Sequence, residues 1–93
     1  MIKRVESGIS CRGINFDCLL SIKEIALRLG LKGVAFIKHD GSLKIDAEGE
    51  EEDLKKFIKK IRKEIPSNPI ENSYITWREP TGGEFENFDI YQE

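Results

Sequence analysis

The residues best placed to do chemistry in this sequence lie between Cys11 and Asp17, immediately before an apolar pattern with helical spacing. A loop here would lead into a helix whose first backbone N–H groups are unpaired and whose dipole is positive at that end. Such a helix entrance is a natural site for an anion such as phosphate. Asp17 stands at the same entrance, so its carboxylate either caps the helix or occupies the space of the anion.

Metal-ligating residues are few. Cys11 and Cys18 are separated by six residues, a spacing that matches no common zinc motif, and His39 is the one histidine of the chain. We expect no metal site and interpret the cysteines as small apolar side chains. A redox pair across the loop and a metal shared between subunits remain the alternatives. We expect His39 to be a solvated loop residue, because no partner for a general base is evident.

The loop must be held by the elements around it. Alternating residues predict a strand over 3–11, and apolar positions predict a helix that ends at Gly30. A second strand is predicted over 34–38. The Asp40-Gly41 pair that follows it predicts a hairpin turn, with a returning strand over 43–47.

The second half of the sequence also predicts a helix followed by strands. Acidic residues 50–53 open a second helix, and lysines on its outer faces are balanced by acids, which favours a solvated surface. Pro66 ends it, followed by a loop at Ser67-Asn68-Pro69. Strands are expected over 74–78 and 88–91, around a turn at 80–83. The order predicts an α+β fold, a ferredoxin-like βαββαβ sandwich: an antiparallel sheet with two helices on one face and a short extra C-terminal edge strand.

Composition limits the class of protein. Ninety-three residues suit one domain, 1–93, and a net charge of −2 without basic runs argues against a nucleic-acid binder. The chain has no apolar stretch long enough to span a membrane. Its first residues do not resemble a secretory signal, so we expect a cytoplasmic protein.

Four segments, in this order and spacing, resemble the acylphosphatase family. They are C-R-G-I-N-F-D at 11–17, L-G-L-K-G at 29–33, D-G-S-L-K-I-D-A-E-G at 40–49 and W-R-E-P-T-G-G-E-F-E-N-F-D-I at 77–90. The resemblance covers nearly the whole chain and implies the same ferredoxin-like sandwich. It also implies a function, because acylphosphatases hydrolyse acyl phosphates to a carboxylate and phosphate without a covalent step.

The resemblance places the family's reactive positions on this sequence. The family's first loop reads approximately V-Q-G-V-G-F-R, and its amides and arginine hold the phosphate; an asparagine in G-W-V-R-N orients the attacking water. Asp17 stands in place of that arginine and Ile37 in place of that asparagine. The phosphate-binding loop would comprise Arg12, Gly13, Ile14, Asn15 and Phe16. Ile37 has no group with which to hold a water.

We therefore expect an acylphosphatase-like protein that has lost acyl-phosphate hydrolysis and serves as a monomeric binding or regulatory module. It would use no cofactor, and its partner would be a small anionic ligand or another protein. Asp17 is expected to cap the first helix in place of the anion. The alternative is a hydrolase whose rearranged site takes its positive charge from Arg12 or Lys38. An RNA-binding domain is disfavoured, because the strand after the hairpin has no aromatic residue and carries Asp46 and Glu48.

Overall fold

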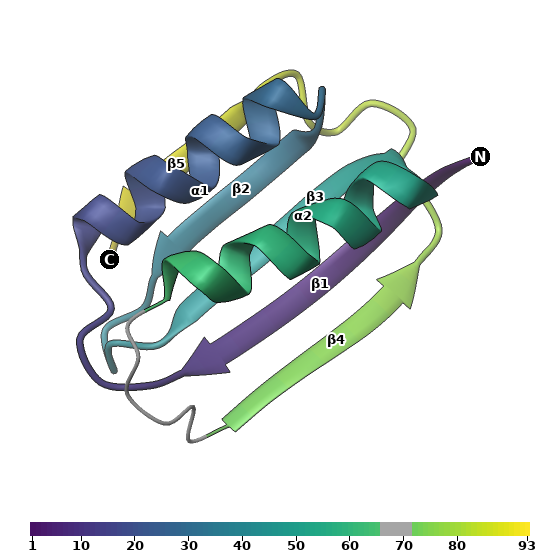
Figure 1. Ribbon diagram of the computed structural model, residues 1–93. Helices are drawn as coiled ribbons and strands as arrows, with labels where there is room; N and C mark the ends of the chain where they lie inside the picture. Colours follow the sequence, from purple (N-terminus) through teal and green to yellow (C-terminus); the bar gives the residue numbers. More distant parts are fainter. Residues whose placement is uncertain (66–71) are drawn as a thin grey trace.

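The computed structural model describes residues 1–65 and 72–93, which form one five-stranded sheet with two helices on one face (Figure 1). The elements in chain order are β1 (Ile2–Ser10), α1 (Phe16–Arg28), β2 (Lys32–Ile37), β3 (Leu43–Glu50), α2 (Glu51–Glu64), β4 (Asn72–Arg78) and β5 (Phe88–Gln92). The strands lie in the order β4-β1-β3-β2-β5. Four of them pair antiparallel, and β5 joins parallel to β2, which makes the sheet mixed. The predicted ferredoxin-like sandwich with an extra C-terminal edge strand is confirmed, but the sheet is not wholly antiparallel as predicted, because β5 runs parallel to β2.

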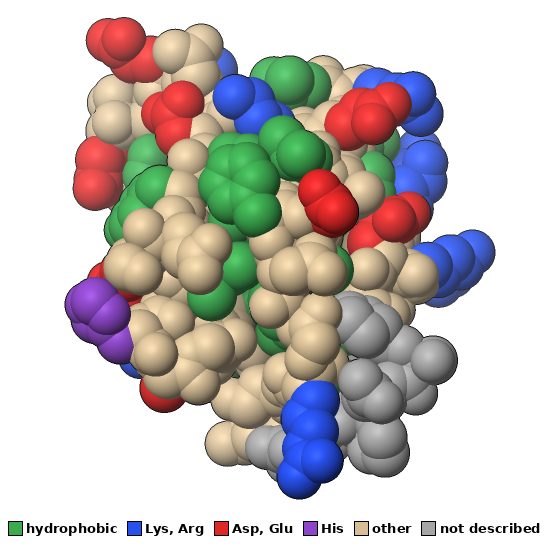
Figure 2. Space-filling view, turned by 90° about the vertical axis from the view of Figure 1, so that its left-hand side faces the viewer, with side chains coloured by type: hydrophobic (Ala, Val, Ile, Leu, Met, Phe, Trp, Pro, Cys, Tyr) green, Lys and Arg blue, Asp and Glu red, His purple; other side chains and the backbone are tan. Residues whose placement is uncertain are grey.

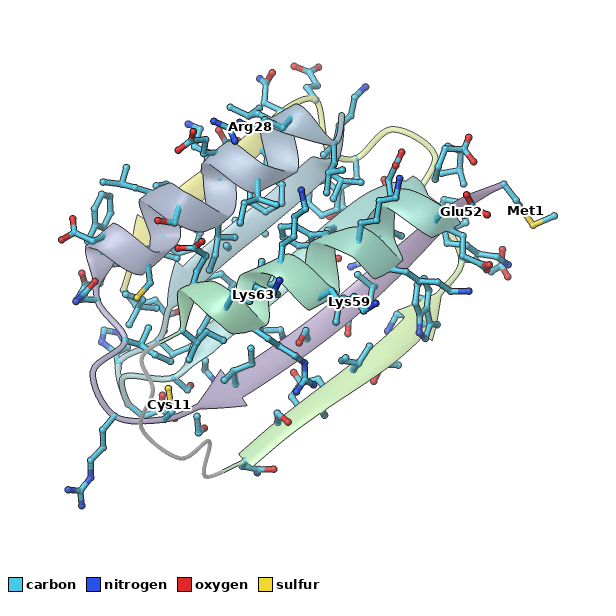
Figure 3. All side chains as sticks on the ribbon, in the orientation of Figure 1. Met1, Cys11, Arg28, Glu52, Lys59 and Lys63 are labelled. Carbon is cyan, nitrogen blue, oxygen red and sulfur yellow. The ribbon has the colours of Figure 1, made fainter. Side chains whose placement is uncertain are left out.

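Each helix buries one stripe against the sheet. The buried residues of α1 are Cys18, Leu19, Ile22 and Ala26, and those of α2 are Leu54, Phe57 and Ile61. This spacing of three or four residues keeps one side of each helix on the core. The lysines predicted to be solvated are indeed exposed, and Lys59 and Lys63 lie on the surface of α2 (Figure 3). The two helices predicted from the sequence pattern are confirmed.

The hairpin between β2 and β3 forms as predicted. Lys38 N donates to Ser42 O at 2.8 Å, and Gly41 adopts a φ of +87°, which glycine tolerates and other residues rarely adopt. The resulting register pairs Ile37 with Leu43. At the other end of β2, Gly33 is required for a different reason, because a Cβ there would lie 2.0 Å from Asp46 O. The two strands therefore approach closely at Gly33.

A single core lies between the helices and the sheet. Phe57 of α2 and Phe88 of β5 meet edge to face, with ring centroids 5.9 Å apart, near its centre. Phe88 is buried, whereas Tyr74 and Trp77 are exposed on β4.

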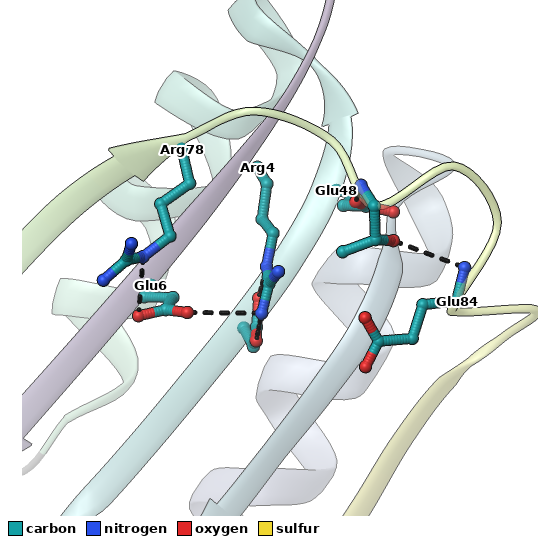
Figure 4. A network of polar contacts seen from close by, with 7 residues as sticks. Arg4, Glu6, Glu48, Arg78 and Glu84 are labelled. Atoms are coloured by element: carbon teal, nitrogen blue, oxygen red, sulfur yellow. Dashed lines mark hydrogen bonds and ion pairs between the residues drawn. The ribbon is translucent and has the colours of Figure 1, made fainter.

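The opposite face of the sheet carries a polar network that ties distant segments together (Figure 4). Arg4 Nε donates to Asp46 Oδ1 at 2.7 Å, which is the main reason that the pKa of Arg4 is raised. Arg4 also contacts Glu6 at 3.2 Å, and Arg78 Nε lies 3.0 Å from the second oxygen of Glu6. Glu48 accepts from the backbone N–H of Thr81. The network therefore links β1, β3 and β4 and holds the β4–β5 connection against this face.

Several strand boundaries differ from the sequence-based expectation. β2 spans Lys32–Ile37 where 34–38 was predicted, β3 extends to Glu50 where the prediction ended at 47, and β4 begins at Asn72, two residues before the predicted start. The first strand spans Ile2–Ser10, one residue earlier at each end than predicted, and leaves Cys11 to the loop. The predicted loop at 67–69 lies outside the described residues. Among the described residues, no helix is both long enough and apolar enough to cross a membrane.

Candidate functional site

The loop between β1 and α1 is shaped by one glycine and one asparagine. Gly13 has a φ of +84°, which lets the chain turn. Asn15 is the N-cap of α1: its backbone is extended, and its side-chain Oδ1 accepts from the N–H of Cys18 at 3.2 Å. The cap satisfies one of the free donors at the helix start. The sequence-based expectation that Asp17 caps this helix is therefore wrong.

Asp17 lies one residue inside the helix, on its exposed first turn. Within the described part of the chain its carboxylate makes no hydrogen bond, so its effect on the helix is that of a charge near the positive end of the dipole. Asp17 therefore places a negative charge near the start of α1, but its carboxylate accepts no hydrogen bond from the first N–H groups of the helix.

A surface cleft separates this loop from the hairpin turn. Its volume is about 420 Å³, and one wall is formed by residues 10–14 and the other by residues 40–42. Arg12, Gly13 and Ile14 of the predicted loop line the cleft, whereas Asn15 and Phe16 do not. Cys11 also lies here, where β1 gives way to the loop (Figure 3).

The hairpin wall is acidic. Asp40 accepts from the N–H of Ser42 at 2.9 Å and from its hydroxyl at 2.6 Å. These two bonds, the hydroxyl first, lower the pKa of Asp40 and keep it ionised. Sequence reasoning missed Asp40 and Ser42 as site residues, because it read Asp40-Gly41 only as a turn. Arg12 and the carboxylate of Asp40 therefore lie on opposite walls of the cleft.

A smaller hollow of about 200 Å³ lies beside the cleft and shares Ser10, Asp40 and Ser42 with it. Lys38 and Lys44 line this hollow, so positive charge is available next to the acidic turn. Figure 2 looks at this end of the molecule, where apolar side chains gather among acidic and basic ones. Phe16 and Leu20, at the start of α1, are 44% and 50% exposed.

Ile37 is placed quite differently from Asp17. It is 3% exposed, pairs with Leu43 across the hairpin and belongs to the hydrophobic core. Neither Ile37 nor Asp17 is among the described residues that line the cleft. The structure thus brings Arg12, Gly13 and Ile14 together with the hairpin turn and leaves Asp17 and Ile37 outside that cleft.

The remaining candidates are spread over the molecule. Cys18 is buried on the core side of α1 and Cys11 is half-buried, and the two cysteines do not form a disulfide. His39 is exposed beside the hairpin turn, where its backbone N–H donates to Glu93 at 3.2 Å. No group of three or more histidine, cysteine, aspartate or glutamate residues suited to a metal occurs in residues 1–65 and 72–93.

Most of the chain matches a known family. A family model described as acylphosphatase matches residues 12–90, from the loop to the last strand. The chain belongs to the acylphosphatase family. An acylphosphatase from Thermotoga petrophila is 34% identical over 68 residues, which is 73% of each chain.

Solved structures agree on the fold of this acylphosphatase-family chain. The acylphosphatase from Bacillus subtilis superposes with a TM-score of 0.83 at 21% identity, over 98% of this chain and 99% of that one. The HypF protein, in a structure with phosphate and nucleotide bound, matches with a TM-score of 0.78 at 28% identity. This match covers 100% of the present chain but only 12% of HypF. The same fold therefore occurs both alone and as a small part of a larger protein.

Proposed function

We propose that this member of the acylphosphatase family has lost acyl-phosphate hydrolysis and acts as a binding or regulatory module. One observation carries the proposal: Asp17 and Ile37 stand where the family resemblance places the phosphate-binding arginine and the water-orienting asparagine. Hydrolysis without a covalent step depends on positioning the water and on stabilising the phosphate charge. Both contributions are removed here at once.

The charge change at Asp17 supports the loss of phosphate binding. An exposed carboxylate on the first turn of α1 repels a phosphate that approaches the helix start. The loss of the family's arginine removes on the order of 3 kcal/mol of transition-state stabilisation. Repulsion between the Asp17 carboxylate and the phosphate adds about 1 kcal/mol or more to the barrier. Asp40, whose lowered pKa keeps it ionised, places a second negative charge in the neighbouring cleft.

The burial of Ile37 supports the loss of water activation. Its side chain is apolar and is packed into the core, so it offers neither a donor nor an acceptor to an attacking water. A water at the loop would therefore lack the partner that the family's mechanism requires.

A hydrolase with a rearranged site is the second candidate, and one observation favours it. Arg12 lines the cleft together with Gly13, and Lys38 lines the adjoining hollow. Arginine suits phosphate geometry because its guanidinium can donate two parallel hydrogen bonds. In this alternative Arg12 or Lys38 would replace the missing arginine.

The deciding experiment measures hydrolysis of a small acyl phosphate by four proteins: the natural chain, Asp17→Arg, Ile37→Asn and the double variant. Circular dichroism checks that each is folded. We expect the natural chain to match the buffer blank and the double variant to exceed it by about 100-fold, the effect of one restored oxyanion-type contact.

Saturable turnover by the natural chain would contradict the proposal. Arg12→Ala and Lys38→Ala then identify the source of positive charge, and the variant that abolishes turnover marks the rearranged site. A titration with inorganic phosphate, followed by amide chemical shifts, separates binding from catalysis. Shifts confined to residues 11–16 without turnover would show an anion-binding module.

A further inference from the structure

The open face of the sheet, opposite the two helices, has two ends of different chemical character. At one end Arg4 and Arg78 are bonded to Glu6 and Asp46, so basic and acidic side chains compensate one another (Figure 4). The other end, near the hairpin turn, carries aromatic and basic side chains instead. The two ends therefore differ in what they offer to a ligand.

The register of the strands places five residues in one row across this second end. Phe36 of β2 pairs with Tyr91 of β5 and with Lys44 of β3, and Gly8 of β1 lies between Lys44 and Tyr74 of β4. The row lies on the open face, because Phe36, Lys44 and Gly8 alternate along their strands with buried residues. From one edge of the sheet to the other it runs Tyr91, Phe36, Lys44, Gly8, Tyr74.

Aromatic rings stand at both ends of this row. The rings of Phe36 and Tyr91 stack, with centroids 4.7 Å apart and planes 4° from parallel, and Tyr91 is 45% exposed on the edge strand. The ring of Tyr74 is 48% exposed and lies against Gly8, where a Cβ would be 2.4 Å from a ring carbon. The absence of a side chain at Gly8 thus lets this ring lie over β1, toward the middle of the row. Each end of the row therefore offers an exposed ring on which a planar group can stack.

Two lysines supply positive charge between and beside these rings. Lys44 is the middle residue of the row, and Lys38 lies with it around the hollow of about 200 Å³ that Tyr74 also lines. Asp40 is the one carboxylate among the described residues that line this hollow, and Ser42 already donates to it at 2.9 and 2.6 Å. The charge of Lys38 contributes, after these bonds, to the lowered pKa of Asp40. Within residues 1–65 and 72–93, no carboxylate forms an ion pair with Lys44, so this lysine is available to an anion.

We propose that this row binds a single-stranded nucleic acid, whose bases stack on Tyr74 and on the Phe36–Tyr91 pair and whose phosphate lies against Lys44. A ring, a cation and a second ring match the base, phosphate and base of such a strand. Neighbouring strands of a sheet are about 4.8 Å apart, so Phe36 and the ring over Gly8 are separated by about 10 Å. This exceeds the roughly 3.4 Å between stacked bases, so the two bases must be unstacked, as in single-strand recognition.

The folded sheet answers the objections that the sequence alone raises to RNA binding. β3 has no aromatic residue, but β2 and β5 supply rings on one side of it and β4 supplies a ring on the other. Asp46 is bonded to Arg4 at the opposite end of the face, and Lys32 lies opposite Glu48. The net charge of −2 implies weak binding that depends strongly on salt. This inference does not depend on whether the chain hydrolyses acyl phosphates.

Fluorescence anisotropy tests the proposal with a labelled oligouridine of about eight nucleotides, titrated with the natural chain at low salt. We expect saturable binding that weakens as salt is added. Tyr74→Ala and Tyr91→Ala each remove a stacking ring and should weaken binding by about fivefold or more. Tyr74→Phe keeps the ring and should bind as tightly as the natural chain. Circular dichroism checks that each variant is folded.

A matched pair of charge variants separates this row from general electrostatic attraction. Lys44→Gln removes the central cation, and should weaken binding and reduce the dependence of log K on log salt by about 0.7. Lys59→Gln removes the same charge from the exposed surface of α2, on the opposite face, and should change neither quantity (Figure 3). Equal losses in the two variants would show diffuse attraction and would overturn the proposal.

The probe and its footprint distinguish the remaining outcomes. A natural chain that does not bind the oligonucleotide at low salt overturns the proposal. Uridine monophosphate that binds as tightly as the oligonucleotide also overturns it, because a single nucleotide cannot reach both rings. Amide chemical shifts that change at Phe36, Lys44, Tyr74 and Tyr91 support the proposal, whereas changes confined to residues 11–16 would place the oligonucleotide at the loop and contradict it.

Discussion

Asp17 and Ile37 occupy the two positions to which the resemblance assigns the family's chemistry, and the fold holds them in opposite environments. Asp17 is exposed on the first turn of α1 and makes no hydrogen bond within the described residues. Ile37 is 3% exposed and belongs to the core beneath the helices. The side chain of Asp17 lies outside the hydrophobic core, whereas the side chain of Ile37 is part of it.

The difference bears on how reversible each substitution is. An exposed charge on a helix surface can be exchanged with little effect on folding, because both forms are solvated. A core residue cannot be returned to a polar one without burying an amide. An arginine can therefore be introduced at position 17 with little effect on folding, whereas an asparagine at position 37 would lower the stability of the fold.

The largest effect is expected from Ile37→Asn. The variant loses the transfer free energy of a buried isoleucine and buries a polar amide, which together should lower the free energy of unfolding by about 3 kcal/mol or more. That loss is a large fraction of the free energy of unfolding of a typical domain, which is roughly 5–15 kcal/mol. Urea denaturation followed by circular dichroism measures it.

The matched control is Ile37→Val, which keeps the site apolar and removes one methylene. It should lower the free energy of unfolding by only about 1 kcal/mol. If Ile37→Asn were as stable as Ile37→Val, the side chain would have access to water, and the contrast between the two positions would fail. The same measurement tells whether the double variant of the activity test is folded.

The sequence predicted the elements well because their evidence is local. The helical stripe around Phe57 and the Asp40-Gly41 hairpin depend on neighbours a few residues apart. The cap of α1 was misassigned because Asn15 and Asp17 can both accept an N–H, and the choice depends on where the helix begins. The acidic wall at Asp40 was missed because only the folded sheet brings it beside the loop. Likewise, the alternation of residues along the strand could not tell that Trp77 stays exposed.

An intermediate effect is expected at the cap beside Asp17. Asn15→Ala removes the acceptor for the N–H of Cys18 and should lower the free energy of unfolding by about 1 kcal/mol. Asn15→Asp retains an acceptor at the same place and should keep the natural stability. A neutral Asn15→Ala, together with a costly Asp17→Ala, would mean that Asp17 is the cap after all.

The smallest effect is expected from Asp17 itself. Asp17→Asn removes a negative charge near the positive end of the helix dipole and should cost about 0.5 kcal/mol at low salt. Added salt should reduce this difference, because the side chain is exposed and its charge is screened. Asp17→Arg reverses the charge and should cost about twice as much, still well below Ile37→Asn. Denaturation of the natural chain, Asp17→Asn and Asp17→Arg at low and high salt measures these differences. If a variant at Asp17 lost as much free energy of unfolding as Ile37→Asn, the Asp17 carboxylate would also be needed for the stability of the fold.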